Sequence, residues 1–109
     1  MSEPITLSLQ SKNELVEIVV RVLHPMESGE ALHPKTGKAI PADFLQTIAI
    51  QLNGKTLLEG QTGSALAKNP AFRFSFKGVK AGDNFLVSCT DSKGRKLEQG
   101  IVVPVFKNQ

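Results

Sequence analysis

The stretch AFRFSFKG, residues 71–78, decides the fold class. Its three phenylalanines alternate with Arg73, Ser75 and Lys77. In an extended chain successive side chains point to opposite faces, so the aromatic rings share one face and the polar groups share the other. A period of two residues is typical of a strand that lies between a core and water. The stretch therefore indicates an antiparallel sheet that is covered on one side.

The same alternation recurs along the rest of the chain, and residues typical of turns separate the runs. Asn53-Gly54 suits a type I′ hairpin, because both residues accept a positive φ. We predict strands at roughly 5–10, 15–23, 46–52, 55–60, 71–77, 84–90 and 95–106. About seven short strands and no helical period predict an all-β fold, an immunoglobulin-like antiparallel β-sandwich. Pro104 places the last strand at an edge, or bulges it.

Composition limits the classes of protein to which this chain can belong. The 109 residues form a single domain, 1–109, with a formal net charge of +3. The six phenylalanines are the only aromatic residues, and their alternation favours burial over base stacking, so we expect no nucleic-acid partner. The apolar runs are too short to span a membrane, and MSEPITLSLQ lacks the features of a signal peptide. Taken alone, the residues favour the cytoplasm.

One long irregular segment, LHPMESGEALHPKTGKAIPADFLQ at 23–46, interrupts the strand pattern. It holds both histidines and three of the six prolines. Connections in compact domains are usually about four to six residues long, and longer ones tend to be functional or disordered. Two interpretations are open: a surface crossover without further role, or a rigid binding loop. Met26 within it either contacts a partner or covers the core.

The sequence offers few residues that could act in catalysis. Cys89, the one cysteine, alternates with Phe85 and Val87, which indicates a core position. A thiol in apolar surroundings is inert, so we expect no catalytic residue, no cofactor and no enzymatic activity. Three aspartates are expected to serve in turns and caps: Asp43, Asp83 and Asp91.

The tripeptide His-Pro-Met at 24–26 is similar to one in the immunoglobulin-like superoxide reductases. Their iron takes four imidazoles and one thiolate, whereas this chain has two histidines and a cysteine within a strand. A two-histidine site completed by Glu27 or Glu30 stays open as a formal alternative. We expect no metal, with His24 capping its strand and His33 in solvent. A small metal-dependent redox enzyme of the superoxide-reductase type is nevertheless the alternative function.

Three stretches together resemble one family: LHPMESG at 23–29, KNPAFRFSFKG at 68–78 and AGDNFLVSCTDSKG at 81–94. Their order and spacing over essentially the whole chain are similar to SoxZ proteins. The resemblance implies a non-catalytic subunit that pairs with SoxY, whose Gly-Gly-Cys-Gly-Gly arm carries covalent sulfur intermediates between the Sox enzymes. This sequence closes on VVPVFKNQ, which fits the partner subunit. The family also implies a periplasmic location, reached by co-export with a signal-bearing SoxY. An unrelated adhesion or chaperone sandwich is a further alternative.

A permanent heterodimer of this kind should bury roughly 2,000 Å² or more in total. Some apolar side chains should therefore belong to the interface, although each of them could equally complete the core. The candidates for SoxY binding are Val19, Leu23, Met26, Phe44 and Leu86. When SoxY is absent, exposed interface strands could pair two copies into a homodimer.

Overall fold

The computed structural model describes residues 4–62 and 68–106. These residues form seven strands in two antiparallel sheets, which confirms the all-β, immunoglobulin-like prediction. The strands are β1 (Ile5–Lys12), β2 (Leu15–Val22), β3 (Leu45–Leu52), β4 (Lys55–Gln61), β5 (Ala71–Lys77), β6 (Asn84–Asp91) and β7 (Lys96–Val102). The ends of the expected domain, residues 1–3 and 107–109, lie outside the described residues, as do residues 63–67.

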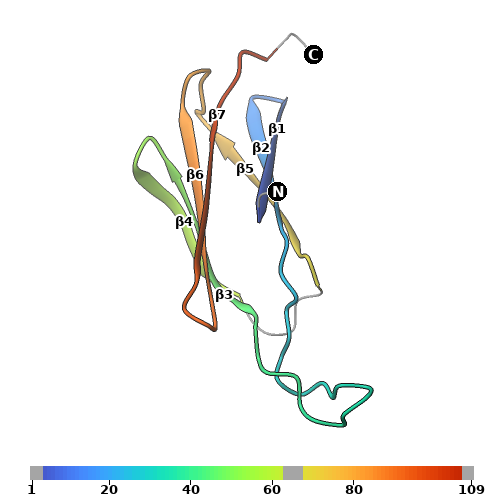
Figure 1. Ribbon diagram of the computed structural model, residues 1–109. Coiled ribbons are helices and arrows are strands. Elements are labelled where there is room, and N and C mark those ends of the chain that lie inside the picture. Colours follow the sequence, from blue (N-terminus) through green and yellow to red (C-terminus); the bar gives the residue numbers. More distant parts are fainter. Residues whose placement is uncertain (1–3, 63–67, 107–109) are drawn as a thin grey trace.

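The two sheets form the layers of a sandwich. One sheet has the order β1-β2-β5 and the other β4-β3-β6-β7. Figure 1 shows the sheets facing each other across the core, with β1 beside β7 on one side of the sandwich. Every neighbouring pair is antiparallel, and short turns require this direction for β1–β2, β3–β4 and β6–β7.

The core lies where the alternating apolar faces meet. In the first sheet, β2 and β5 pair Val16 with Phe76, Ile18 with Phe74 and Val20 with Phe72. These pairs face Phe85 and its neighbours in the second sheet. The rings of Phe76 and Phe85 pack with their centroids 5.9 Å apart. Each fully buried side chain of this size contributes about 1.5–3 kcal/mol relative to an exposed one, which makes the two-residue period decisive.

The last strand is shorter than its sequence suggests. β7 ends at Val102, whereas we expected it to continue to 106. The pairing with β6 becomes irregular at Val103: its N–H donates to Asp83 O at 2.8 Å, but its carbonyl accepts from Gly82 N–H at 2.8 Å, because Asp83 N–H donates to Lys80 O. The predicted edge position of β7 is confirmed. The predicted hairpin between β3 and β4 is confirmed as well, since Asn53 and Gly54 have φ of 51° and 84°.

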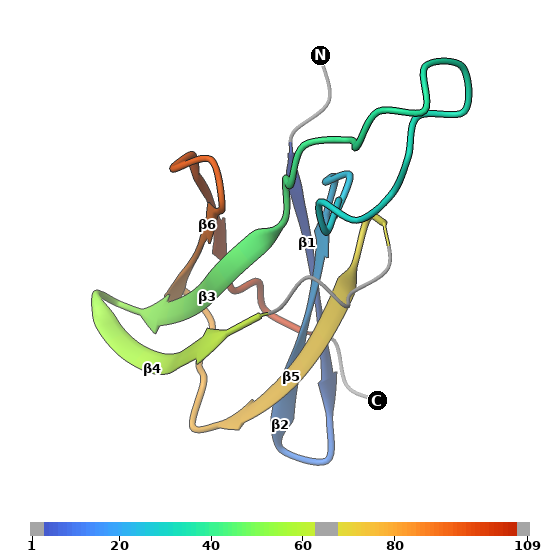
Figure 2. The ribbon, with the colours of Figure 1, turned by 90° about the horizontal axis from the view of Figure 1, so that it is seen from below.

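Residues 23–44, which we call the arm, leave the sandwich between β2 and β3. Figures 1 and 2 both show the arm extending away from the two sheets. It is a loose antiparallel ribbon rather than a random crossover, with isolated bridges between Glu27 and Asp43 and between Leu32 and Ala39. The molecule is elongated as a result, measuring 55 × 26 × 26 Å. In the part of the chain that the structure describes, no helix could span a membrane.

Candidate functional site

The arm holds its shape through backbone hydrogen bonds. Glu27 and Asp43 exchange two N–H···O bonds of 2.8 Å, and further out His33 N–H donates to Lys38 O at 2.8 Å. Residues 30–39 are all exposed or nearly so, and Leu32 near the tip is 64% exposed. A segment that is ordered before binding loses little conformational entropy when it binds, so the arm is suited to contact a partner.

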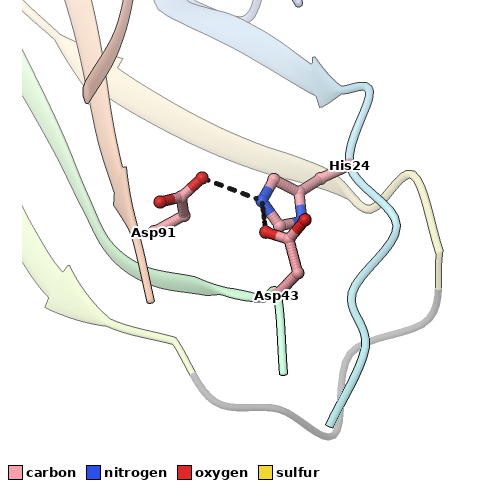
Figure 3. Close-up of side chains that lie close together, drawn as sticks. All are labelled: His24, Asp43 and Asp91. Atoms are coloured by element: carbon pink, nitrogen blue, oxygen red, sulfur yellow. Dashed lines mark hydrogen bonds and ion pairs between the residues drawn. The ribbon is translucent and has the colours of Figure 1, made fainter. Parts of the chain in front are cut away.

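A partly buried ion network, which we call the anchor cluster, holds the base of the arm: His24, Asp43, Asp91, Lys93 and Arg95. His24 follows β2, Asp43 precedes β3 and Asp91 ends β6. Figure 3 shows the His24 ring pointing at both carboxylates, and its Nε2 lies 3.3 Å from Asp43 Oδ1 and 3.3 Å from Asp91 Oδ2. Side chains from both ends of the arm thus meet the end of a strand in the second sheet.

The tautomer of His24 follows from its other ring nitrogen. The backbone N–H of Met26 donates to Nδ1 at 3.2 Å. A ring nitrogen that accepts a hydrogen bond carries no proton, so the proton of the neutral ring is on Nε2, where it faces the two carboxylates. Each nitrogen of His24 therefore has a partner, and the ring links the arm's first turn to the sandwich.

Two cations balance the two carboxylates. Arg95 Nε lies 2.6 Å from Asp91 Oδ2, Arg95 Nη2 lies 2.5 Å from Asp43 Oδ1, and Lys93 Nζ lies 3.6 Å from Asp43 Oδ2. Burial by itself would raise the pKa of Asp91, but hydrogen bonds from Arg95, His24 and the backbone lower that pKa below its usual value. The hydrogen bonds that Arg95 donates to Asp91 and Asp43 raise the pKa of Arg95. The two carboxylates and the two cations of the cluster thus cancel in charge.

The donor set of His24, Asp43 and Asp91 is of a type that could hold a metal ion, because its ligand atoms all lie within 4.8 Å of one another. The arrangement does not fit a metal, however. Arg95 already occupies both carboxylates, and the His24 nitrogen that faces them carries a proton. Among the described residues, no buried side-chain nitrogen or oxygen lacks a hydrogen-bond partner. The contacts are those of a closed structural network.

The cluster corrects two expectations from the sequence. His24 does not simply cap its strand, because its ring is buried and binds two carboxylates. The carboxylates that reach it belong to Asp43 and Asp91, not to Glu27 or Glu30. Asp91 does serve in a turn, as expected, accepting from the backbone N–H groups at 93 and 95. His33 is exposed, as predicted.

Met26 lies on the core side of the arm. Its side chain is 7% exposed and belongs to the hydrophobic core, and its Sδ accepts the Leu45 N–H at 3.4 Å. Of the two interpretations left open, Met26 covers the core. Val19 is also 7% exposed, although its register position is on the outer face of β2. Both residues offer little surface to a partner in this chain, and their role in binding stays a prediction.

The other three candidates offer more surface. Leu23 is 52% exposed, while Phe44 and Leu86 are partly buried. The anchor cluster brings Leu23 and Phe44 toward the same end of the sandwich, because they adjoin His24 and Asp43. Leu86 pairs with Gln51, six residues along β3 from Leu45, and so lies roughly 20 Å from that end. The five candidates therefore do not form one patch.

Cys89 is fully buried in the second sheet, as its alternation indicates. Burial raises the pKa of its thiol to about 11, so the thiol is neutral near pH 7. The thiolate is the nucleophilic form of cysteine, and it is present only in trace amounts at this position.

The chain is thus an immunoglobulin-like sandwich that projects an anchored arm and keeps its one cysteine thiol in the core. Comparison with known proteins identifies the family of the chain. The family model described as "Sulphur oxidation protein SoxZ" matches residues 5–101, and the chain belongs to the SoxZ family. It is thus a sulfur-oxidation protein.

Comparison with solved structures supports the fold. The crystal structure of hypothetical protein PH1083 from Pyrococcus horikoshii OT3 is similar to the chain with a TM-score of 0.60 and 18% sequence identity. The alignment covers 91% of this chain and 86% of that one. A search of curated protein sequences returned no match.

Proposed function

We propose that this chain is the non-catalytic subunit of a SoxYZ-type sulfur carrier. It binds SoxY and supports the base of the cysteine arm on which SoxY carries covalent sulfur intermediates. Membership of the SoxZ family is the finding on which the proposal rests. The complex works in the periplasm, to which the chain is exported together with a signal-bearing SoxY. Its clients are the Sox enzymes that act on the carried sulfur.

The single structural observation that supports a non-catalytic role is the burial of Cys89. A protein that carried sulfur itself would need a reactive, accessible thiol, because sulfur transfer proceeds through a thiolate. The one cysteine of this sequence is 0% exposed, and its pKa is raised to about 11. This supports the proposal that the thiol that bears sulfur belongs to SoxY.

The arm and its anchor support a scaffolding role. A carrier thiol on a flexible segment needs a base of fixed shape, so that each enzyme finds it in the same place. The arm supplies a preformed surface, with Leu32 at its tip and Leu23 and Phe44 near its base. We assign these side chains, together with Leu86, to contacts with SoxY or with the enzymes that it visits.

Co-expression of the chain with SoxY tests this function. The expected result is a stable complex with one copy of each polypeptide, measured as a native mass by light scattering after size-exclusion chromatography. SoxY that elutes apart from the chain at micromolar concentrations would contradict the proposal. The same measurement on the isolated chain shows whether it pairs with itself when SoxY is absent.

A further inference from the structure

The outer face of the β1-β2-β5 sheet carries a concentration of positive charge. Alternation and register place four basic side chains on this face: Lys12, Arg21, Arg73 and Lys77. All four are exposed. Glu17, at the centre, is the only acidic residue among them, and it lies 3.3 Å from Arg73. We call this surface the basic face.

The basic face accounts for the net charge of the protein. Four basic residues and one acidic residue leave three positive charges, and the formal net charge of the whole chain is also +3. The strands of the other sheet have no such excess, since they carry Lys55 and Lys96 with Glu59, Asp91 and Glu98, and Lys96 Nζ lies 3.7 Å from Glu98 Oε2. The field of the protein is therefore asymmetric, with its positive side on β1, β2 and β5.

The basic face also has a hollow. A depression of about 210 Å³ lies at one end of the face and is lined by Gln10, Lys12, Asn13, Leu15, Glu17 and Ser75. Leu15 lies between Lys12 and Lys77 in the strand register and is half-buried. The lining of the hollow thus combines one cation, Lys12, and one anion, Glu17, with the apolar side chain of Leu15.

We propose that the basic face is a docking surface for an acidic patch on an enzyme that acts on the carried sulfur. This inference rests on the proposed function, because it assumes a carrier that must visit enzymes. Charge complementarity selects the occupant: four exposed cations with one partly neutralised anion favour a negatively charged surface. Binding of this kind is fast and transient, as a carrier that moves between enzymes requires.

The chemistry of the face favours a protein over the other polyanions. Its register positions hold no aromatic side chain on which bases could stack. Its apolar residues, Val19 and Leu15, are buried or half-buried, so nothing projects that could insert into a lipid surface. The remaining positions are small or polar, as in the rim of a protein interface.

A double charge reversal on the face tests the proposal. Lys12→Glu with Lys77→Glu is compared with the control pair Lys55→Glu with Lys96→Glu on the other sheet. Both variants change the net charge equally, so any difference between them reports the position of the charge. Each is purified with SoxY and supplied to a cell-free thiosulfate-oxidising system that lacks its own carrier. The initial rate of thiosulfate consumption is measured against the concentration of the complex, at low and at physiological salt.

The face variant is expected to bind SoxY normally and to lower kcat/KM roughly tenfold or more at low salt, with a smaller loss at physiological salt. The control variant should stay within about twofold of the wild type. Equal rates for the two variants would overturn the docking proposal. So would loss of SoxY binding in the face variant, which would make the face part of the heterodimer interface.

Binding to vesicles of anionic phospholipid tests whether the basic face binds a lipid surface instead of an enzyme. If the face variant loses vesicle binding while thiosulfate consumption is unchanged, the occupant is a lipid surface and the proposal is wrong. If the wild-type chain forms no complex with SoxY, the proposed function itself fails and this inference falls with it. The two failures are thus distinguished by the wild-type measurement.

Discussion

His24 Nε2 and Asp91 Oδ2 lie 3.3 Å apart, although 67 residues separate them in the chain. The contact joins the first residues of the arm to the hairpin between β6 and β7. Asp91 in turn binds Arg95, which also binds Asp43 at the other end of the arm. The direction in which the arm projects is therefore set by side chains on both of its ends and on a strand of the second sheet.

Removal of the shared cation should destabilise the fold. Arg95→Met leaves two carboxylates, one of them fully buried, without the guanidinium that binds both. We expect the free energy of unfolding to fall, measured as a lower urea midpoint at pH 7. Lys96→Met is the control, since its exposed pair with Glu98 contributes less than about 0.5 kcal/mol. Equal losses in the two variants would show that the anchor cluster is not structural.

Acid should weaken the fold through Asp91. Its pKa in the folded state lies below the value of about 3.9 in an unfolded chain, so the unfolded state takes up the proton first as the pH falls. The stabilisation is then complete above about pH 5 and is lost as the pH falls through the folded pKa. Urea denaturation between pH 7 and pH 2.5 should show this decline.

Asp91→Asn should be less stable at pH 7 and should show a shallower decline in acid. Some decline remains in this variant, because the pKa of Asp83 is also lowered, by the backbone N–H of Lys80 and by Asn53. An unchanged acid slope in Asp91→Asn would remove Asp91 from the explanation.

Cys89 should be unreactive in the native protein. With a pKa raised to about 11 by burial, its thiol is almost wholly neutral at pH 7.5 and lies inside the core. We expect Ellman's reagent to modify it only as fast as the protein unfolds, and within seconds in 6 M guanidinium chloride. Rapid labelling of the native chain would place the thiol at the surface and would reopen a direct role in sulfur chemistry.

A methyl group at Gly29 should loosen the arm. Gly29 has φ of +93°, and an added Cβ would lie 3.2 Å from the Cβ of Ala42 on the opposite side of the ribbon. Gly37, near the tip, also has a positive φ of 72° but has open space around it. Gly29→Ala should therefore speed amide hydrogen exchange at Glu27 and Asp43 roughly tenfold or more, while Gly37→Ala leaves those two amides unchanged. Equal exchange in both variants would show that the base of the arm does not depend on this contact.

Contacts of the arm's base with SoxY can be tested at Leu23, which is 52% exposed. Leu23→Asp should raise the Kd for SoxY at least roughly tenfold, measured by titration calorimetry, without changing the urea midpoint. Leu57→Asp on β4, where the leucine is 38% exposed, serves as the control. Unchanged affinity in Leu23→Asp would exclude this part of the arm from the interface. Met26→Asp is not suited to the test, because Met26 is in the core.

The strands could be predicted from the sequence because their signal is local. Alternation at Phe72, Phe74 and Phe76 follows from burying one face of a strand, and nothing distant is needed to detect it. The predicted end of β7 is too late because its apolar run continues past Val102, whereas regular pairing ends where the Val103 carbonyl accepts from Gly82 rather than from Asp83.

The anchor cluster could not be predicted in the same way. His24, Asp43 and Asp91 are separated by 19 and 48 residues, and only the packing of the two sheets brings them together. Asp91 also forms a local turn, which is sufficient to explain its presence in the sequence. Likewise, Met26 could not be assigned to core or surface until the arm's path placed its sulfur against the Leu45 backbone.

Thiosulfate consumption by a carrier-depleted, cell-free system measures whether this chain acts only through SoxY, as we propose. With SoxY and the chain together the system should consume thiosulfate, and with either polypeptide alone it should not. Sustained consumption with the chain alone would contradict the account, since the polypeptide would then carry sulfur itself.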